Sequence, residues 1–503
     1  MRKIALVLFL AYGLQGFNAQ KIPPNFIFII TDDQDVLLGG TDDMPSLKRV
    51  FRDGGMEFKN AFVDTPICCP SRTSTLSGRL GHNLGQQQIQ NWCGNFTNTV
   101  NENATWITRL GENGYAVGLS GKYHNSPPQG FVPKGWSDFF SLNNECQYYN
   151  NSYNDNGKTV RFGDSPTDYM TSTIGNRSLA FIKKALDSKT PFFAYIAPHA
   201  SHMPTTVAPW YMNAALPSYK APRTPQYNAS GTGKHWVVSD QGPISDVLEI
   251  GIDDIYTARH RALLSVDDII TDVYSLLEAS NVLQNTYWIY TSDHGYNLGN
   301  FRLPVEKFHV LEQDITVPFL IRGPGISAGT VSNALVSNID IGATVLDLAG
   351  LPPAETPTDG RSFASALGVI PSRTSNLFRS VSDRDRVIIE YGRWGTGYVI
   401  RGACQISCGI CNDALSRLLD APSNTYSGLR IINSTHNLAY FEFSPDSLHP
   451  ALPTSTNWTE LYDLSNDPYE LINLAASGTN DPLVQQLSKE LWTVASCKGS
   501  ECP

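Results

Sequence analysis

The stretch Asn25-Phe26-Ile27-Phe28-Ile29-Ile30, followed directly by Thr31-Asp32-Asp33, decides the fold. A nearly continuous apolar run of this length is typical of a strand that is buried on both faces of a parallel sheet. Two adjacent carboxylates at the end of such a strand repel each other unless a cation or hydrogen-bond donors lie between them. From this segment alone, a ligand site at Asp32 and Asp33 and a solvated turn or helix cap are equally good interpretations.

Three further apolar runs are each followed directly by polar residues. Residues 116–119 lead into Lys122 and His124, residues 192–197 lead into His199 and His202, and residues 287–291 lead into Asp293 and His294. Open α/β sheets bind their ligands at the carboxyl edge of the strands. We therefore expect these side chains to converge with Asp32 and Asp33 on one pocket.

Helical patterns between these runs indicate an α/β fold. Residues 261–280 place apolar side chains on one broad face, and residues 338–349 do the same before Gly350 ends the pattern. We predict a large, doubly wound, mostly parallel sheet flanked by helices over residues 21–375. The polar stretch 143–164, rich in Asn and Tyr, is expected to form a surface loop.

After Pro371 the pattern changes to short strands with little helix between them. Strand-like runs cover residues 387–391, 398–400, 429–432 and 438–443, and a helical pattern covers residues 484–494. We predict a smaller C-terminal α+β domain with an antiparallel sheet over residues 376–503.

The first twenty residues have the pattern of a secretory signal peptide, because Met1-Arg2-Lys3 precede a short apolar run at residues 4–14. No later stretch is long and apolar enough to span a bilayer, so we expect a soluble mature chain in the lysosome or outside the cell. A net charge of -10 gives no support for a nucleic-acid partner. Seven glycosylation sequons agree with the secretory route: Asn95, Asn103, Asn150, Asn176, Asn228, Asn433 and Asn457.

Nine cysteines leave one thiol without a disulfide partner within the chain. The adjacent pair Cys68 and Cys69 has the plain interpretation of buried or disulfide-bonded cysteines, as is usual in a secreted chain. The spacing of Cys404, Cys408 and Cys411 suggests zinc, but no tight second Cys/His pair lies beside them in the sequence. Disulfides are the favoured interpretation of these three residues in an oxidising compartment.

The run Cys68-Cys69-Pro70-Ser71-Arg72, extended by Leu76-Ser77-Gly78-Arg79, resembles the signature of the type I sulfatases. Pro70 suits the first turn of a helix, which places Cys68 at a positive helix end. The resemblance implies an alkaline-phosphatase/sulfatase-like fold and oxidation of Cys68, not Cys69, to formylglycine by the formylglycine-generating enzyme. The eight other cysteines are then free to pair with one another.

The resemblance also assigns roles to the polar residues that follow the strands. Taken singly, each lysine is usually solvated and each histidine is usually a hydrogen-bonded loop residue, but together they occur in sulfatase order. The implied metal ligands are Asp32, Asp33, Asp293, His294 and the side chain of residue 68. Hard carboxylate oxygens suit Ca²⁺ or Mg²⁺ far better than a soft metal, and Ca²⁺ is the favoured ion of the two. The implied sulfate-binding and catalytic residues are Lys122, Lys307, His199, Arg72, His124 and His202.

The implied reaction starts from the hydrated aldehyde at residue 68, one hydroxyl of which attacks sulfur. His202, near Lys307, protonates the departing sugar oxygen, and His124 removes the proton of the second hydroxyl so that sulfate leaves. A serine at position 68 lacks that second hydroxyl, so Cys68→Ser is expected to stop turnover.

Several other segments resemble the N-acetylglucosamine-6-sulfatase branch of the family, which implies 6-O-sulfated N-acetylglucosamine of heparan or keratan sulfate as the substrate. They are Asp32-Asp33-Gln34-Asp35, Gly233-Lys234-His235-Trp236, Leu264-Ser265-Val266-Asp267-Asp268, Leu303-Pro304-Val305-Glu306-Lys307, Arg322-Gly323-Pro324-Gly325 and Leu461-Tyr462-Asp463-Leu464. Three alternatives remain open. They are a sulfatase for another sulfated sugar, a phosphodiester or phosphonate hydrolase of the same fold, and a catalytically dead glycan-binding protein.

Overall fold

The computed structural model describes residues 22–84, 105–125, 129–143, 147–305, 307–354, 358–392, 424–444, 458–476, 478 and 481–503. The predicted signal peptide at residues 1–20 and the predicted strand at residues 398–400 lie outside these ranges. So do the sequons at Asn95, Asn103 and Asn457 and the cysteines Cys93, Cys146, Cys404, Cys408 and Cys411. None of the helices within these ranges has the length and apolar character needed to cross a membrane.

A ten-stranded sheet forms the centre of the molecule, with the strand order β10-β2-β9-β8-β1-β7-β3-β4-β5-β6. The strands are β1 (Asn25–Thr31), β2 (Met56–Phe62), β3 (Ala116–Gly121), β4 (Asp138–Leu142), β5 (Ser152–Asp155), β6 (Lys158–Arg161), β7 (Phe192–Ala197), β8 (Thr286–Ser292), β9 (Phe319–Arg322) and β10 (Thr330–Ser337). The central run β8-β1-β7-β3-β4 is parallel, whereas β9, β5 and β6 pair antiparallel with their neighbours. The sheet is therefore mixed, with the predicted parallel arrangement at its centre.

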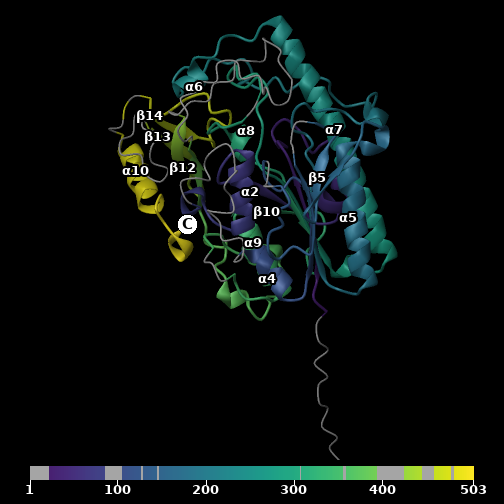
Figure 1. Ribbon diagram of the computed structural model, residues 1–503. Helices are drawn as coiled ribbons and strands as arrows, with labels where there is room; N and C mark the ends of the chain where they lie inside the picture. The colour runs from purple at the N-terminus through teal and green to yellow at the C-terminus, as the bar shows by residue number, and fades with distance from the viewer. Residues whose placement is uncertain are drawn as a thin grey trace, which may run out of the picture.

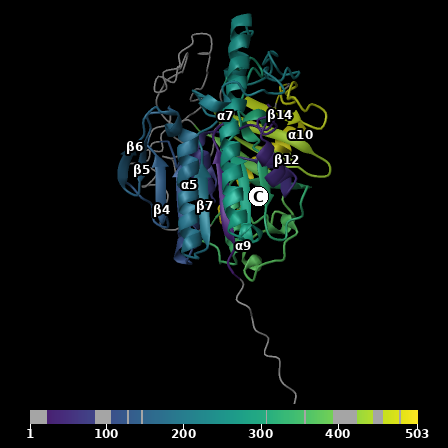
Figure 2. The same cartoon turned by 90° about the vertical axis from the view of Figure 1, so that its right-hand side faces the viewer.

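Strand β1 shows why the sheet is covered on both sides. Phe26, Phe28 and Ile30 point into one apolar layer, and Ile27 and Ile29 point into the other. Helices α2 (Cys68–Ser77), α4 (Trp106–Glu112) and α9 (Asp340–Ala349) supply the first layer. Helices α1 (Pro45–Leu47), α5 (Met170–Asp187) and α7 (Asp246–Ala279) supply the second, and Figure 2 shows α5 and α7 crossing in front of the strands. A strand between two such layers has no solvent face, which explains its unbroken apolar sequence.

Helix α7 is longer than its apolar pattern predicts. It begins at Asp246, with the Ser245 side chain accepting a hydrogen bond from the Leu248 amide, rather than near residue 261. Its first turns pack Leu248, Ile252 and Tyr256 into a separate small core. The apolar residues of these turns therefore face different neighbours from the apolar residues of the rest of the helix. In Figure 1 this end of α7 extends beyond the strands.

The predicted surface loop at residues 143–164 is wrong in part. Its described residues include β5 and β6, which extend the large sheet at one edge. Phe140 and Tyr153 stack at a ring separation of 4.3 Å, and Tyr153 is fully buried. Asn154, next to Tyr153, is also buried, and its side chain donates to the Phe131 carbonyl at 2.7 Å, so a polar residue in this strand is satisfied inside the protein.

The predicted C-terminal antiparallel sheet is present, with the order β11-β12-β13-β14. Its strands are β11 (Arg386–Tyr391), β12 (Thr425–Ile432), β13 (Asn437–Ser444) and β14 (Trp458–Asp463), and helix α10 (Pro482–Val494) packs on one face. The other face packs against Phe62, Val310 and Ile315 of the large unit, so the two sheets share a core. Two short helices, α6 (Trp236–Ser239) and α8 (Glu312–Ile315), complete the chain's described α-helices (Figure 1).

Candidate active site

Cys68 is the first residue of helix α2 and is almost fully buried, at 2% exposure. Pro70 lies in the first turn, as predicted, and Gly78 ends the helix in the left-handed region at φ 69°. Cys69 is disulfide-bonded, whereas Cys68 is the free cysteine among the described residues. Burial raises the pKa of the Cys68 thiol against the opposing charges of Lys122 and Lys307. Of these two adjacent cysteines, Cys69 is therefore part of a disulfide and Cys68 keeps a free thiol.

The ends of β1 and β8 bring candidate metal ligands to this thiol. Cys68 Sγ lies 3.2 Å from His294 Nε2 and 3.6 Å from Asp32 Oδ1. His294 Nε2 lies 3.3 Å from Asp33 Oδ1. One ligand atom from each of Asp32, Asp33, Cys68 and His294 lies within 4.8 Å of the other three. Residues far apart in the sequence thus surround one point at the carboxyl edge of the sheet.

Asp293 lies at the side of this group. Its Oδ2 accepts a hydrogen bond from Arg72 Nε at 2.9 Å, and its Oδ1 accepts one from the Asp33 amide at 3.1 Å. Asp293 Oδ1 is 3.5 Å from His294 Nε2. Burial raises the pKa of Asp293, and the Arg72 guanidinium opposes that shift. One oxygen of Asp293 is therefore within reach of the shared point, while the other is held by Arg72.

The donor atoms fit a hard divalent cation. His294 Nδ1 lies 2.9 Å from the Gly295 carbonyl, which can only accept, so Nδ1 carries the proton and Nε2 presents a lone pair. Asp32 and Asp33 supply carboxylate oxygens to this group. Oxygen-rich sets of this kind suit Ca²⁺ or Mg²⁺ rather than a soft metal.

Two buried lysines bind the same carboxylates. Lys122 Nζ donates to Asp32 Oδ2 at 2.8 Å, and Lys307 Nζ donates to Asp33 Oδ1 at 2.9 Å. Burial by itself would raise the pKa of each carboxyl, but the lysines and nearby histidines outweigh it and hold the pKa values of Asp32 and Asp33 well below their usual range. Both carboxyl groups are therefore ionised.

The loop after β7 places two histidines beside Asp32. The Ser201 amide donates to the Asp32 carbonyl at 2.8 Å, which docks the loop. His199 Nδ1 donates to Asp32 Oδ2 at 3.0 Å, and the rings of His199 and His202 stack at 4.5 Å. His202 Nδ1 lies 2.6 Å from the Met203 carbonyl, so Nδ1 carries the proton and Nε2 is the basic atom.

His124 is buried just past β3, two residues after Lys122. Burial lowers the pKa of His124, and the charges of Arg72 and Lys122 lower it further. Burial also lowers the pKa of His202. Both imidazoles are therefore neutral, the form from which a histidine can accept a proton.

Two residues of this neighbourhood were missed by the sequence analysis. Tyr148 lies in the stretch interpreted as a surface loop, yet it is buried and its hydroxyl donates to the His202 carbonyl at 2.9 Å. Arg259 lies in the part of α7 that the pattern did not include, and its Nη2 donates to the Asp33 carbonyl at 2.5 Å. The position of Arg259 beside the apolar face of the helix could have indicated a buried charge. No feature of the sequence indicated that Tyr148 is buried.

The predicted glycosylation sites that the structure describes differ in accessibility. Asn150, Asn176 and Asn433 are exposed. Asn228 is half-buried, and its Oδ1 accepts a hydrogen bond from the Ile244 amide at 2.9 Å. The three exposed sites are the better acceptors for a glycan.

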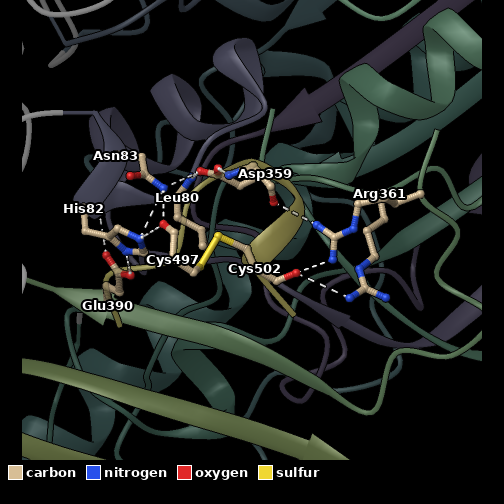
Figure 3. The surroundings of a disulfide bond; sticks show 10 residues. Leu80, His82, Asn83, Asp359, Arg361, Glu390, Cys497 and Cys502 are labelled. Atoms are coloured by element: carbon tan, nitrogen blue, oxygen red, sulfur yellow. Dashed lines mark hydrogen bonds and ion pairs between the residues drawn. A yellow bond between two sulfur atoms is a disulfide. The ribbon is translucent and has the colours of Figure 1, made fainter. Parts of the chain in front are cut away.

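Cys497 and Cys502 form a disulfide near the C-terminus (Figure 3). His82 and Asn83, just after helix α2, both bond the Cys497 carbonyl at 2.8 Å. Glu390 of β11 pairs with His82, so this corner joins α2 to the small sheet and to the chain end.

Comparisons with known proteins show the family and the fold. The family model described as Sulfatase matches residues 24–351. The N-acetylglucosamine-6-sulfatase of Homo sapiens is 35% identical over 518 residues, which covers 99% of this chain and 89% of the human protein. A solved structure in complex with its substrate D-glucosamine-2-N,6-O-disulfate matches with a TM-score of 0.70 at 18% identity, covering 93% of this chain and 97% of that chain. The phosphonate monoester hydrolase of Agrobacterium radiobacter matches with a TM-score of 0.65 at 18% identity, covering 93% and 95%.

Proposed function

Because this chain belongs to the sulfatase family, we propose that it removes the 6-O-sulfate from N-acetylglucosamine residues of glycosaminoglycans such as heparan or keratan sulfate. One observation carries the proposal. The free, buried Cys68 thiol begins helix α2 within 3.6 Å of Asp32 and 3.2 Å of His294, beside two buried lysines. Near full-length similarity to enzymes named for this substrate supports the choice of sugar.

In this proposal Cys68 is converted to formylglycine by the formylglycine-generating enzyme, and Asp32, Asp33, Asp293, His294 and residue 68 hold a calcium ion. When bound, the ion and the aldehyde together supply a polarised electrophilic site and an acidified hydroxyl at neutral or acid pH. Mg²⁺ is a weaker candidate because a site built from several protein ligands leaves little room for the waters that it retains.

The charges of the site favour an anionic substrate once the ion is present. Three carboxylates (Asp32, Asp33 and Asp293) are balanced by three cations (Arg72, Lys122 and Lys307). A divalent cation therefore leaves a net charge of +2 in this buried site. A sulfate ester brings a negative charge into that field, which strengthens its binding.

The chain's own side chains bind the sulfate and move protons. Lys122 and Lys307 bind sulfate oxygens, His199 helps to position the ester, and Arg72 orients residue 68 through Asp293. His202 Nε2 is the ring atom that faces the departing sugar oxygen, because Nδ1 keeps its proton for the Met203 carbonyl. Nε2 takes up a proton from solvent first and then gives that proton to the departing oxygen, which returns the ring to its neutral form. His124, buried and neutral, takes a proton at residue 68 to complete the cycle.

We also propose a secretory route, with cleavage before Lys21, a catalytic domain to residue 375 and a smaller domain from residue 376. The Cys497–Cys502 disulfide and the disulfide-bonded Cys69 support an oxidising compartment. Exposed sequons at Asn150, Asn176 and Asn433 support passage through the endoplasmic reticulum. Lysosome and extracellular space both fit these features.

The experiment uses full-length protein from a eukaryotic secretory host. Mass spectrometry of the tryptic peptide 60–72, with and without an aldehyde-trapping reagent, is expected to show formylglycine at residue 68. The protein is expected to release sulfate from N-acetylglucosamine 6-sulfate faster than from the same sugar sulfated at another hydroxyl. Cys68→Ala should abolish release, and Thr73→Ala, a small buried change on the same helix, should preserve it.

Two results would contradict the proposal. An unmodified Cys68 in a host that converts a control sulfatase favours a glycan-binding protein without activity. Faster cleavage of an aryl phosphonate monoester than of any sulfate ester favours the phosphonate-hydrolase alternative, whose fold this chain shares.

A further inference from the structure

Arg259 of helix α7 lies inside the candidate active site, although the proposed reaction assigns it no role. The residue is 2% exposed. Its guanidinium group lies between the loop after β1, which carries Asp32 and Asp33, and the loop after β8, which carries Asp293 and His294. A buried charge in this position contacts the metal-binding side of the site without offering a ligand atom.

The first contact is with the loop after β1. Arg259 Nη2 donates to the Asp33 carbonyl at 2.5 Å and to Asp35 Oδ1 at 3.1 Å. Asp33 has φ 59°, in the left-handed region that few residues other than glycine adopt. A backbone in that region is strained and persists only where its surroundings hold it. The Asp293 carboxylate holds the Asp33 amide, and Arg259 holds its carbonyl.

The second contact is with the loop after β8. The Arg259 guanidinium lies over the ring of Tyr296, 3.9 Å from its centroid. Tyr296 follows His294 by two residues, and its amide donates to the Gln313 carbonyl at 2.8 Å. The ring is therefore a fixed platform at the base of the loop that presents His294. One planar side chain thus connects both loops that carry candidate ligands.

We propose that Arg259 is a positioning residue that locks these two loops together, so that Asp33 and His294 present their ligand atoms to one ion. The inference rests on the proposed metal site. The two atoms, Asp33 Oδ1 and His294 Nε2, lie 3.3 Å apart, a separation that either loop would change by moving on its own. Lysine cannot replace this group fully, because only a guanidinium donates in its plane while stacking on an aromatic face.

The test measures calcium binding rather than activity alone. The thermal unfolding midpoint of the full chain is recorded against calcium concentration for the wild type, Arg259→Met and Arg261→Met. Arg259→Met is expected to raise the calcium concentration at half-maximal stabilisation about 10- to 100-fold, the usual effect of losing a residue that orients metal ligands. Arg261, two residues along the same helix, donates to the Ala214 carbonyl at 3.1 Å, so Arg261→Met is the matched control and is expected to keep the wild-type value.

Steady-state kinetics give a second readout. The kcat of Arg259→Met on N-acetylglucosamine 6-sulfate is expected to recover as calcium is raised, which a general folding defect would not do. Arg259→Lys is expected to fall between the wild type and Arg259→Met, and Tyr296→Leu is expected to weaken calcium binding where Tyr296→Phe does not.

The outcomes separate this inference from the proposed metal site. The inference is overturned if the calcium concentration at half-maximal stabilisation of Arg259→Met lies within twofold of the wild-type value. It is also overturned if Arg261→Met raises that calcium concentration as much as Arg259→Met does. If Arg259→Met is not secreted in a folded form, the inference is overturned when Arg259→Lys and Tyr296→Leu both need the same calcium concentration as the wild type for half-maximal stabilisation. A wild-type chain that calcium does not stabilise overturns the metal site and this inference together.

Discussion

Two buried clusters of charged residues respond to burial in opposite ways. In the candidate active site, Asp32 and Asp33 are each paired with a lysine, and their pKa values lie well below the usual range although burial opposes this. In the second cluster, burial raises the pKa of Glu470 to about 8. Both sites exclude water, so the difference comes from the cations present and not from the depth of burial.

The second cluster, called here the inter-sheet cluster, consists of Lys234, Glu460, Tyr462 and Glu470. Lys234 Nζ donates to Tyr462 Oη at 2.8 Å and lies 4.1 Å from that ring's centroid. Glu470 accepts one hydrogen bond from the Glu312 amide, and its Oε1 has no hydrogen-bond partner among the residues that the structure describes. One lysine near two carboxyl groups leaves Glu470 protonated at neutral pH. The comparison indicates that Asp32 and Asp33 keep their charge because a lysine pairs with each of them, whereas Glu470 has no such partner of its own in the described part of the chain and is neutral.

The largest expected effect separates chemistry from stability. Cys68→Ser removes the residue that the active-site charges surround, and kcat is expected to fall by about 10⁵-fold or more. The thermal midpoint should change little, because serine is smaller and stays in the same helical position. Sulfate release and differential scanning calorimetry on the same samples check this, and turnover close to wild type would contradict the assigned role of Cys68.

The next effect tests the pairing of charges in the active site. Lys307→Met leaves Asp33 without its ammonium partner, which is expected to cost about 3–5 kcal/mol in the free energy of unfolding in calcium-free buffer. Calcium should restore part of the loss, since a cation then faces the same carboxylate. Denaturant titration with and without calcium measures both quantities, with Lys307→Arg as the charge-conserving control.

A smaller effect is expected from Glu470→Gln in the inter-sheet cluster. Because the folded pKa of about 8 lies above the ordinary value of 4.5, the folded chain binds this proton more tightly than the unfolded chain. Wild-type stability therefore falls as pH rises from about 4.5 to about 8, and Glu470→Gln should remove that slope. At pH 8.5 the variant should be about 1–3 kcal/mol more stable than wild type and keep its activity.

Unfolding curves between pH 5 and pH 9 measure the Glu470 effect. Glu249→Gln serves as the control, because Glu249 pairs with Arg223 at the surface. An unchanged pH slope in Glu470→Gln would show that the two clusters do not differ in the way described.

The smallest effect concerns the ion pair beside the C-terminal disulfide (Figure 3). Burial opposes protonation of His82, but Glu390 outweighs it and raises the pKa of His82 to about 9. The pair's contribution is complete below pH 6.5 and is lost as pH rises through about 9. His82→Gln should therefore cost about 1–2 kcal/mol at pH 6 and progressively less above pH 9. An equal cost at pH 6 and pH 10, seen in thermal scans, would contradict a charged His82.

Local patterns explain why much of the fold was predictable. The apolar runs that form β1, β3, β7 and β8 can be identified as strands from the sequence alone, since a strand covered on both faces needs no polar residue. The parallel arrangement then places the residues after each run at one edge. The convergence of Asp32, Lys122, His199 and Asp293 follows from that rule without any knowledge of distances.

The elements that were missed depend on contacts with distant parts of the chain. Strands β5 and β6 lie in a polar segment, and the aromatic residues of that segment are buried only because β4 packs beside them. The first half of α7 packs against its own small core, so its apolar positions do not continue the later pattern.

The sequence by itself determined the fold class and most of the residues that the structure brings together at one edge of the sheet, because strand periodicity and motif order are local properties. Only the tertiary structure decided how Asp293 divides its oxygens and that Arg259 joins two loops. It also decided that Glu470 lies beside Lys234. Those outcomes depend on distances of a few ångströms between segments up to hundreds of residues apart, and no local pattern encodes such distances.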